Sequence, residues 1–290
     1  MKNEVVVLAV LLLGTIPLGF AKDGCALRAS EPFGSTPLYK SGDGIGFSAP
    51  RLEVDADGAP DSYRVDGNGL SYTCDGVAAL DANGRRITKK TDPLHWQQRC
   101  REAWAQATKT KDYSRIAIFG FLKDPATGQP LIQRQGDPLP GQAYLTTTTV
   151  SIPGVSGNVQ RKWIDANLIP YVVLPSKFVS HYHVKPGALA LVYRPKTDSL
   201  AFAVYGDGGN FGEGSVKLHR ALSNDPMSVS GGVRRAKRKI PDKVEVVVFP
   251  SDVPRISGDA AAWNQAIQEE GNNVVSRLGG TAAMKACLKK

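Results

Sequence analysis

The sequence of 290 residues has no internal repeat, and charged residues make up only 22% of it. Such a composition excludes a disordered tail, a collagen and a coiled coil. The hydrophobic share of 42% is enough to bury a core. Glycine (30 residues) and proline (19 residues) are frequent, which predicts many short elements joined by turns.

No apolar run long enough to span a membrane follows residue 21. The one apolar run, 5–20, follows Lys2 and leads to Gly19 and Ala21, the small residues expected just before a cleavage site. This pattern predicts a signal peptide over residues 1–21, with an uncleaved membrane anchor as the alternative. We therefore expect a secreted or periplasmic protein with no stable membrane insertion after cleavage.

Cysteine is scarce, and the four cysteines form no CxxC motif, which disfavours a metal site built from them. An even number of cysteines in an exported chain favours two disulfides. Three pairings are possible. The preferred one joins Cys74 to Cys100 as a local clamp and Cys25 to Cys287 as a tie between the two ends of the chain.

Negative charge is in deficit, because 36 Lys and Arg residues face 27 Asp and Glu residues. A net charge of +9 favours anionic partners such as acidic glycans, peptidoglycan or lipid headgroups. Five cations crowd the segment 234–239, but no aromatic residues interleave them, so stacking on nucleic-acid bases has no support. A solvated loop is the favoured interpretation, and no nucleic-acid partner is expected.

Several short apolar segments bounded by glycine, proline or aspartate predict buried strands. Because little helix separates them, they favour a mainly β fold, a closed or nearly closed β-barrel with a few short helices. The expected strands are 116–121, 143–150, 170–174, 188–193, 200–205 and 244–249.

Helices are expected in a few places only. Trp96, Cys100 and Trp104 share one face of a helix over 95–109, and a short helix is expected over 215–222 with Ser215 as its cap. Residues 255–290 are predicted to form a C-terminal helical extension packed on the barrel. Its helices, 259–270 and 272–288, are expected to break at Gly271 and at Gly279–Gly280.

The segment with the most chemical potential runs from Asp207 to Glu213 and is rich in glycine. Asp207 follows a predicted buried strand, and the flexible glycines after it allow the loop to turn both carboxylates toward one cleft. Two carboxyl groups across a sugar cleft are the minimal machinery of glycoside hydrolysis. The competing interpretation is that both residues only form turns or cap a helix.

Further motifs occur in a fixed order along the chain. They are Leu-Glu-Val-Asp-Ala-Asp-Gly-Ala-Pro at 52–60, Gln-Gly-Asp-Pro-Leu-Pro-Gly-Gln-Ala-Tyr-Leu-Thr-Thr-Thr at 135–148, Tyr-Val-Val-Leu-Pro at 171–175, Tyr-Gly-Asp-Gly-Gly at 205–209, Gly-Glu-Gly-Ser at 212–215 and Val-Val-Val-Phe-Pro at 246–250. Together they resemble glycoside hydrolase family 75, the chitosanase family. The resemblance covers about residues 43–251, with an insertion near 75–130.

The resemblance implies a catalytic domain over 22–254 that cleaves β-1,4-glucosamine links inside the polymer with inversion. Asp207 and Glu213 fall on the essential acids of the family, although the loop between them is shorter here. Glu213 is assigned as the acid and Asp207 as the base. Tyr205 and Phe211 are expected to border the polysaccharide substrate, and no cofactor or metal is expected.

A positively charged surface repels chitosan, a polycation, unless the cleft is locally acidic. Asp55 and Asp57 belong to an acidic segment that could supply such a patch, and they are predicted to bind substrate. Two alternatives stay open: a peptidoglycan hydrolase with the same acid pair, and a non-catalytic glycan- or envelope-binding protein. A calcium loop formed by Asp55, Asp57, Asp61 and Asp66 is disfavoured, because other ligands of such a loop are absent.

Overall fold

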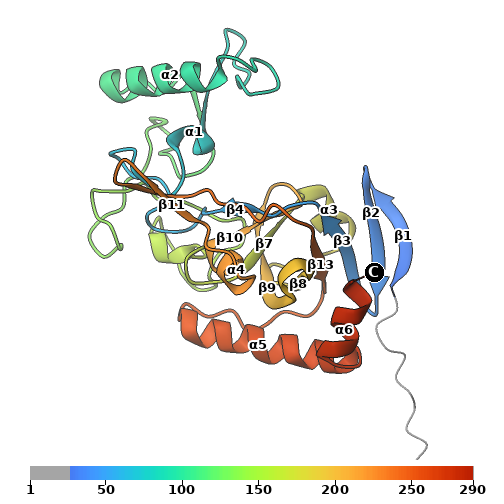
Figure 1. Cartoon of the computed structure of the whole chain (residues 1–290). Helices are drawn as coiled ribbons and strands as arrows, with labels where there is room; N and C mark the ends of the chain where they lie inside the picture. The colour runs from blue at the N-terminus through green and yellow to red at the C-terminus, as the bar shows by residue number, and fades with distance from the viewer. Residues whose placement is uncertain (1–26, 290) are drawn as a thin grey trace, which may run out of the picture.

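The structure is a computed structural model that describes residues 27–289. Its centre is a mixed sheet of nine strands in the order β1-β2-β3-β13-β8-β9-β7-β10-β4 (Figure 1). The strands are β1 (Arg28–Phe33), β2 (Thr36–Ser41), β3 (Gly44–Ala49), β4 (Glu53–Asp55), β7 (Tyr171–Leu174), β8 (Leu189–Arg194), β9 (Ser199–Gly208), β10 (Glu213–Ser215) and β13 (Val244–Val248).

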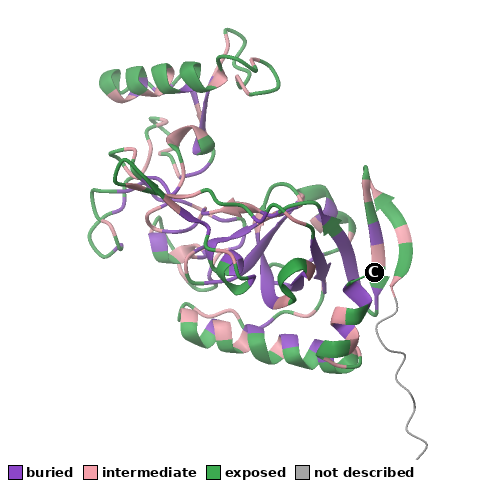
Figure 2. Cartoon of the chain, in the orientation of Figure 1, coloured by how far each residue is buried: buried purple, intermediate pink, exposed green. Residues whose placement is uncertain are grey.

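The middle of this sheet is buried on both faces. Every residue of β7, β8 and β13 is buried, as the purple strands of Figure 2 show. Uninterrupted apolar strands are stable only where both faces of the sheet are covered. The apolar segments 170–174, 188–193 and 244–249 do form strands, and the prediction of a mainly β fold is confirmed.

The predicted closed barrel is not confirmed. In the described part of the chain, β1 and β4 are the two edges of the sheet and do not pair with each other. The β1–β2 hairpin extends the sheet from β3 in the direction away from β4, so the two edges lie far apart (Figure 1). The sheet is therefore open.

The C-terminal helices α5 (Ala260–Arg277) and α6 (Thr281–Leu288) pack on the sheet, where α5 contacts β8 and β9. The expected break at Gly271 is wrong, because α5 runs through this residue. A Cβ atom at Gly271 would overlap the ring of Phe202, so the glycine allows the helix to approach β9 closely. The second break is confirmed, since Gly279 and Gly280 have a φ of +94° and separate the two helices.

Residues 73–121 form a small unit that stands apart from the sheet, and we call it the lobe (Figure 1). It contains α1 (Thr73–Gly76), β5 (Val77–Ala79), α2 (Trp96–Thr110) and β6 (Ile116–Ile118), and β5 pairs with β6. The helix expected over 95–109 is thus present. The core beneath the lobe consists of eight buried residues: Tyr63, Val77, Cys100, Ala107, Tyr113, Ile116, Phe121 and Tyr144.

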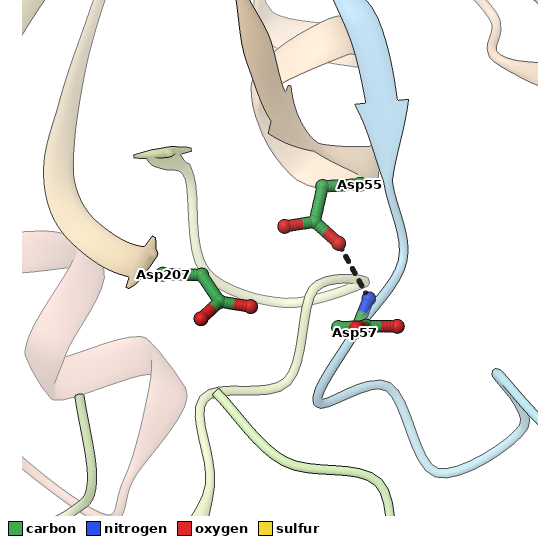
Figure 3. Close-up of side chains that lie close together, drawn as sticks. All are labelled: Asp55, Asp57 and Asp207. Atoms are coloured by element: carbon green, nitrogen blue, oxygen red, sulfur yellow. Dashed lines mark hydrogen bonds between the residues drawn. The ribbon is translucent and has the colours of Figure 1, made fainter. Parts of the chain in front are cut away.

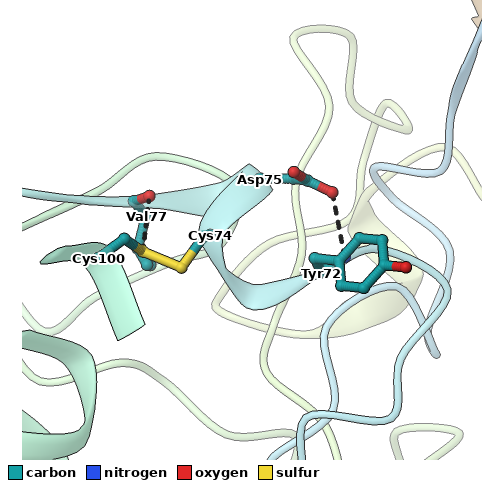
Figure 4. The surroundings of a disulfide bond; sticks show 5 residues. All are labelled: Tyr72, Cys74, Asp75, Val77 and Cys100. Atoms are coloured by element: carbon teal, nitrogen blue, oxygen red, sulfur yellow. Dashed lines mark hydrogen bonds between the residues drawn. A yellow bond between two sulfur atoms is a disulfide. The ribbon is translucent and has the colours of Figure 1, made fainter. Parts of the chain in front are cut away.

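A disulfide between Cys74 and Cys100 joins α1 to α2, as predicted (Figure 4). The buried sulfur of Cys100 also lies 3.6 Å from the carbonyl oxygen of Val77. The second predicted disulfide involves Cys25, which lies outside the described residues, so that pairing stays a prediction. The predicted signal peptide, 1–21, lies outside them as well.

The lobe begins and ends at one narrow point. The carbonyl oxygen of Gly76 accepts hydrogen bonds from the backbone N–H groups of Phe119 (2.9 Å) and Gly120 (3.0 Å). A Cβ atom at Gly120 would lie 2.7 Å from the Cα atom of Gly76. These two glycines therefore let the incoming and outgoing chains touch.

The remaining elements connect the sheet. They are η1 (Gln160–Lys162), α3 (Ser176–His181), η2 (Pro195–Thr197), α4 (Val216–Ala221) and the hairpin β11 (Met227–Ser230) and β12 (Val233–Ala236). Ser215 caps α4 as expected, since its Oγ accepts a hydrogen bond from the N–H of Leu218 at 3.1 Å. The segment 143–150 makes isolated bridges and is not a strand. None of the helices in residues 27–289 is long and apolar enough to cross a bilayer.

Candidate functional site

A cavity of about 510 Å³ opens between the edge of the sheet and the lobe. Carboxyl groups from β4, β9, β10 and α1 line it, together with Tyr63, Tyr72, Gln97 and Lys237. The four acids predicted from the sequence therefore meet in one place. The six lining carboxyl groups belong to Glu53, Asp55, Asp57, Asp75, Asp207 and Glu213.

Strand pairing brings these acids together from distant parts of the chain. β10 runs parallel to β4, so that Glu213 pairs with Glu53 and Ser215 pairs with Asp55. β7 lies between β10 and β9, and β9 carries Asp207 near its end. Because β10 is antiparallel to β7 and β7 is parallel to β9, the starts of β4 and β10 lie at the same end of the sheet as the end of β9.

A bulge in β9 directs Asp207 into the cavity. Val172 of β7 pairs with Tyr205 and Val173 pairs with Asp207, so Gly206 is an extra residue in the ladder. In a regular strand Tyr205 and Asp207 would face the same side, and the bulge separates their directions. Only glycine fits here, because a Cβ atom at Gly206 would lie 2.6 Å from the side chain of Tyr171.

Three donors hold one oxygen of Asp207. Its Oδ1 accepts hydrogen bonds from the backbone N–H of Thr149 (2.8 Å), from the hydroxyl of Thr149 (2.8 Å) and from the N–H of Gly208 (2.7 Å). Burial raises the pKa of Asp207, and these donors oppose that rise because they favour the ionised form. Within residues 27–289, all three of these donors contact Oδ1 and none of them contacts Oδ2.

Glu213 has weaker support for its ionised form. Its Oε1 accepts a hydrogen bond from the side-chain amide of Asn210 at 3.1 Å. Burial raises the pKa of Glu213, and the negative charges of Asp207 and Glu53 raise it further. A carboxyl group in such a setting keeps its proton more readily than an exposed one.

Asp55 and Asp57 face Asp207 across the floor of the cavity (Figure 3). The backbone N–H of Asp57 donates to Asp55 Oδ1 at 2.8 Å. Burial raises the pKa of both carboxyl groups well above its usual range, and the negative charge of Asp207 contributes to each rise. At neutral pH this arrangement favours shared protons or a bound cationic group.

One oxygen from each of Asp55, Asp57 and Asp207 lies within 4.8 Å of the other two. Carboxylate oxygens are the ligands of hard cations such as Ca²⁺ and Mg²⁺, so these three residues are the ones that could hold a metal ion. The calcium loop considered from the sequence does not form. Asp61 instead accepts a hydrogen bond from the amide of Asn167 at 3.1 Å, and Asp66 pairs with Arg64 at 3.2 Å.

The two aromatic residues expected to border the sugar are not brought to the cavity. Tyr205 is buried in β9 with 4% of its surface exposed. Phe211 packs into the main core, where its ring centroid lies 4.3 Å from that of Phe47 and 5.0 Å from that of Phe178. The loop after Asp207 turns Phe211 inward, because an apolar ring gains more from contact with this aromatic cluster than from water.

Sequence reasoning missed Thr149, Tyr72 and Asp75. The backbone N–H of Tyr72 donates to Asp75 Oδ2 at 3.1 Å, and both residues flank Cys74 (Figure 4). Burial raises the pKa of Asp75, which the positive charge of Arg235 lowers in part. Tyr72 and Asp75 lie close to Cys74 in the sequence, so the predicted disulfide could have pointed to them as site residues.

No protein-family model matches the chain, and no curated protein matches its sequence. Function must therefore be inferred from the sequence motifs and from the geometry and charge of the cavity.

Proposed function

We propose that the protein is a glycoside hydrolase that cleaves β-1,4-linked amino-sugar polymers, such as chitosan, at internal bonds. The observation that carries this proposal is that Asp207 and Glu213, the two acids of the glycine-rich motif, open into the same cavity. A volume of about 510 Å³ falls in the range of small-molecule binding sites. The resemblance of the motifs to glycoside hydrolase family 75 supports the same reaction.

The roles of the two acids follow from their surroundings. Three hydrogen-bond donors on Asp207 stabilise its carboxylate, which suits a base. Glu213 accepts hydrogen bonds from Asn210, but burial and two negative neighbours raise its pKa, which suits an acid that holds its proton. A pair of carboxyl groups with different environments is how one site carries out acid and base chemistry together.

The reaction with inversion proceeds in one displacement. Glu213 gives its proton to the glycosidic oxygen as the bond between that oxygen and the anomeric carbon breaks. Asp207 takes a proton from a water molecule, whose oxygen attacks the anomeric carbon from the opposite face. Asp55 and Asp57 accept hydrogen bonds from hydroxyl or amino groups of the sugar on the cavity floor.

We further propose that the protein is secreted or periplasmic, with the catalytic domain over 22–254. The disulfide between Cys74 and Cys100 supports this location, because disulfides persist in oxidising compartments. An extracellular polysaccharide is then the expected partner, with no nucleic acid and no cofactor.

The test is to incubate the purified protein with chitosan, chitin oligomers and peptidoglycan sacculi, and to identify the products by mass spectrometry. Cleavage of one of these polymers is expected, and Glu213→Gln should lower its rate at least ~100-fold, the usual scale for a lost general acid. Glu269→Gln on the exposed face of α5 is the matched control and should leave the rate unchanged. Absence of cleavage would favour a non-catalytic glycan-binding protein, whereas full activity of Glu213→Gln would show that Glu213 is not the acid.

A further inference from the structure

A second cavity, of about 500 Å³, lies next to the first one. Both cavities are lined by Tyr72, Asp75 and Gln97, so these three side chains form a shared wall. Tyr72 has 46% of its surface exposed, although it is a large aromatic residue. A polymer chain that passes the carboxyl groups of the first cavity can therefore continue beyond Tyr72 into the second.

The two cavities carry opposite charge. The first is lined by six carboxyl groups and by a single cation, Lys237. The second is lined by Arg101 and Arg235, and its only carboxyl group is Asp75 in the shared wall. Lys237 lies at the boundary, with its Nζ 3.5 Å from the phenol oxygen of Tyr72.

Arg235 is held rigidly at this boundary. Its Nη1 donates to the carbonyl oxygens of Gly69 (2.6 Å) and Ser71 (2.9 Å), and its Nη2 donates to that of Gly67 (2.8 Å). Its guanidinium carbon lies 4.4 Å from the centroid of the Tyr72 ring. Carbonyl groups accept these hydrogen bonds without neutralising the guanidinium, and Asp75 is the only carboxyl group that lines the same cavity, so the two arginines leave the cavity net positive.

Arg101 on α2 and Lys237 after β12 are exposed, and neither forms an ion pair with a described carboxylate. Lys239, in contrast, pairs with Glu53 at 3.3 Å. The sequence favours a solvated loop for the basic run 234–239. In the structure, two of its cations line the cavities: Lys237 lines the first and Arg235 the second. Uncompensated cations at the wall of a cavity favour an anionic ligand group.

We propose that the second cavity is a sugar subsite that recognises a carboxylate, so that the substrate is an amino-sugar polymer in which some sugars carry an acidic substituent. This inference rests on the proposed function. Arg101 pairs with the carboxylate of the bound sugar, because a guanidinium forms strong charge-assisted hydrogen bonds to it, and the positive charge of Arg235 in the same cavity adds to the attraction. A glucosamine in the same place would bring its ammonium group against Arg101 and Arg235, so this subsite favours an acidic sugar over glucosamine.

The test measures binding to the Glu213→Gln protein by calorimetry, so that no ligand is cleaved. The ligands are four tetrasaccharides: N-acetylglucosamine alternating with N-acetylmuramic acid, N-acetylglucosamine alternating with glucuronic acid, a neutral chitin tetramer and a cationic chitosan tetramer. At low salt at least one anionic tetramer should bind about tenfold more tightly than the neutral one, and the advantage should shrink as salt screens the charges. Comparison of the two anionic tetramers identifies which acidic sugar is preferred.

Charge reversal locates the subsite. Arg101→Glu should weaken binding of the anionic tetramer about tenfold, with binding of the neutral tetramer unchanged within a factor of two. Lys109→Glu makes the same change of charge on the same helix, outside both cavities, and should leave both affinities unchanged.

Equal binding of the neutral and anionic tetramers, or equal effects of the two reversals, would overturn the subsite. That failure differs from failure of the hydrolase proposal. Cleavage that Glu213→Gln abolishes, without any preference for acidic sugars, contradicts the subsite alone. Absence of cleavage by the unmutated protein contradicts the hydrolase proposal itself.

Discussion

The sheet and the lobe supply opposite walls of one cleft, but they are stabilised in different ways. β8 is buried along its whole length and lies within a large apolar core. The lobe has a core of eight buried residues and a disulfide between Cys74 and Cys100. Small cores leave little margin over the entropy cost of folding, so a covalent link contributes more there.

This difference matches a division of chemical tasks. The sheet positions Asp207 and Glu213, which would carry out bond cleavage and need a rigid geometry. The lobe positions Gln97 and Arg101, which would contact sugars farther along the polymer. We infer that catalysis depends on the sheet and that contacts with sugars farther along the polymer depend in part on the lobe.

The strongest test of this division is Asp207→Asn. An amide cannot take a proton from water, so kcat should fall by about 10²–10⁴ while KM changes little. Thermal unfolding should be nearly unchanged, because an amide oxygen can still accept the hydrogen bonds of Thr149 and Gly208. Gln97→Ala in the lobe is the counterpart and should raise KM instead. A comparable loss of kcat in both variants would contradict the division.

The second test removes the disulfide with Cys74→Ser and Cys100→Ser. The bond closes a loop with a sequence separation of 26, which by chain-entropy arguments contributes about 3 kcal/mol. Limited proteolysis should then cut the lobe first, within residues 80–115, while the sheet stays intact and KM rises. Simultaneous loss of the lobe and the sheet would show that the two regions unfold as one unit.

The third test changes Thr149, the hydrogen-bond partner of Asp207, the proposed base. Thr149→Val keeps the shape of the side chain but removes the hydroxyl that donates to Asp207. The pKa of Asp207 should rise, and because a base must be ionised to act, the acidic limb of the profile of kcat/KM against pH should move to higher pH. Activity at acidic pH should drop about tenfold. Thr149→Ser restores the donor and should restore the profile.

The smallest expected effect concerns stability and pH. Burial raises the pKa of Asp57, so between the ordinary value of about 3.9 and the raised value the folded protein holds a proton that the unfolded chain has lost. The contribution of Asp57 to stability therefore falls as pH rises through this window. Asp57→Asn should raise Tm by about 2–4 °C at pH 8 and leave it unchanged at pH 3.

Asp81→Asn provides the opposite case within the lobe. The backbone N–H of Arg85 donates to Asp81 and lowers its pKa, so this carboxylate stabilises the folded state above its ordinary pKa and loses that effect on acidification. The substitution should not raise Tm at pH 8. A rise in both variants would mean that burial of Asp57 is not the cause.

Local sequence patterns were sufficient for the elements whose environment is uniform. The apolar run 188–193 correctly predicts β8, because a strand that is covered on both faces needs apolar residues throughout. The spacing of Trp96, Cys100 and Trp104 correctly predicts α2, because one face of this helix packs on the small core of the lobe. The sequence also predicts that Asp207 and Glu213 lie near one cavity, since a short loop keeps its two ends close, and both residues do line the same cavity.

Features that depend on distant contacts could not be predicted. Gly271 interrupts the helical pattern, but its contact with Phe202 is visible only once α5 lies on β9. The glycine-rich loop around Phe211 predicts an exposed side chain. In the structure, Phe211 instead packs against Phe47 of β3 in the core. The approach of Asp55 to Asp207 depends on the pairing of β4 with β10, which no local pattern specifies.

The touching chains at Gly76 and Gly120 have a consequence for how this architecture can diversify. Because the polypeptide returns to its point of departure, the intervening residues can be exchanged for a different cassette without altering the path of the strands that carry Asp207 and Glu213. Gln97 and Arg101 belong to that cassette, and Asp207 and Glu213 do not. Under the proposed function, the contribution of Gln97 and Arg101 to polymer preference can thus change in evolution while Asp207 and Glu213 stay in place.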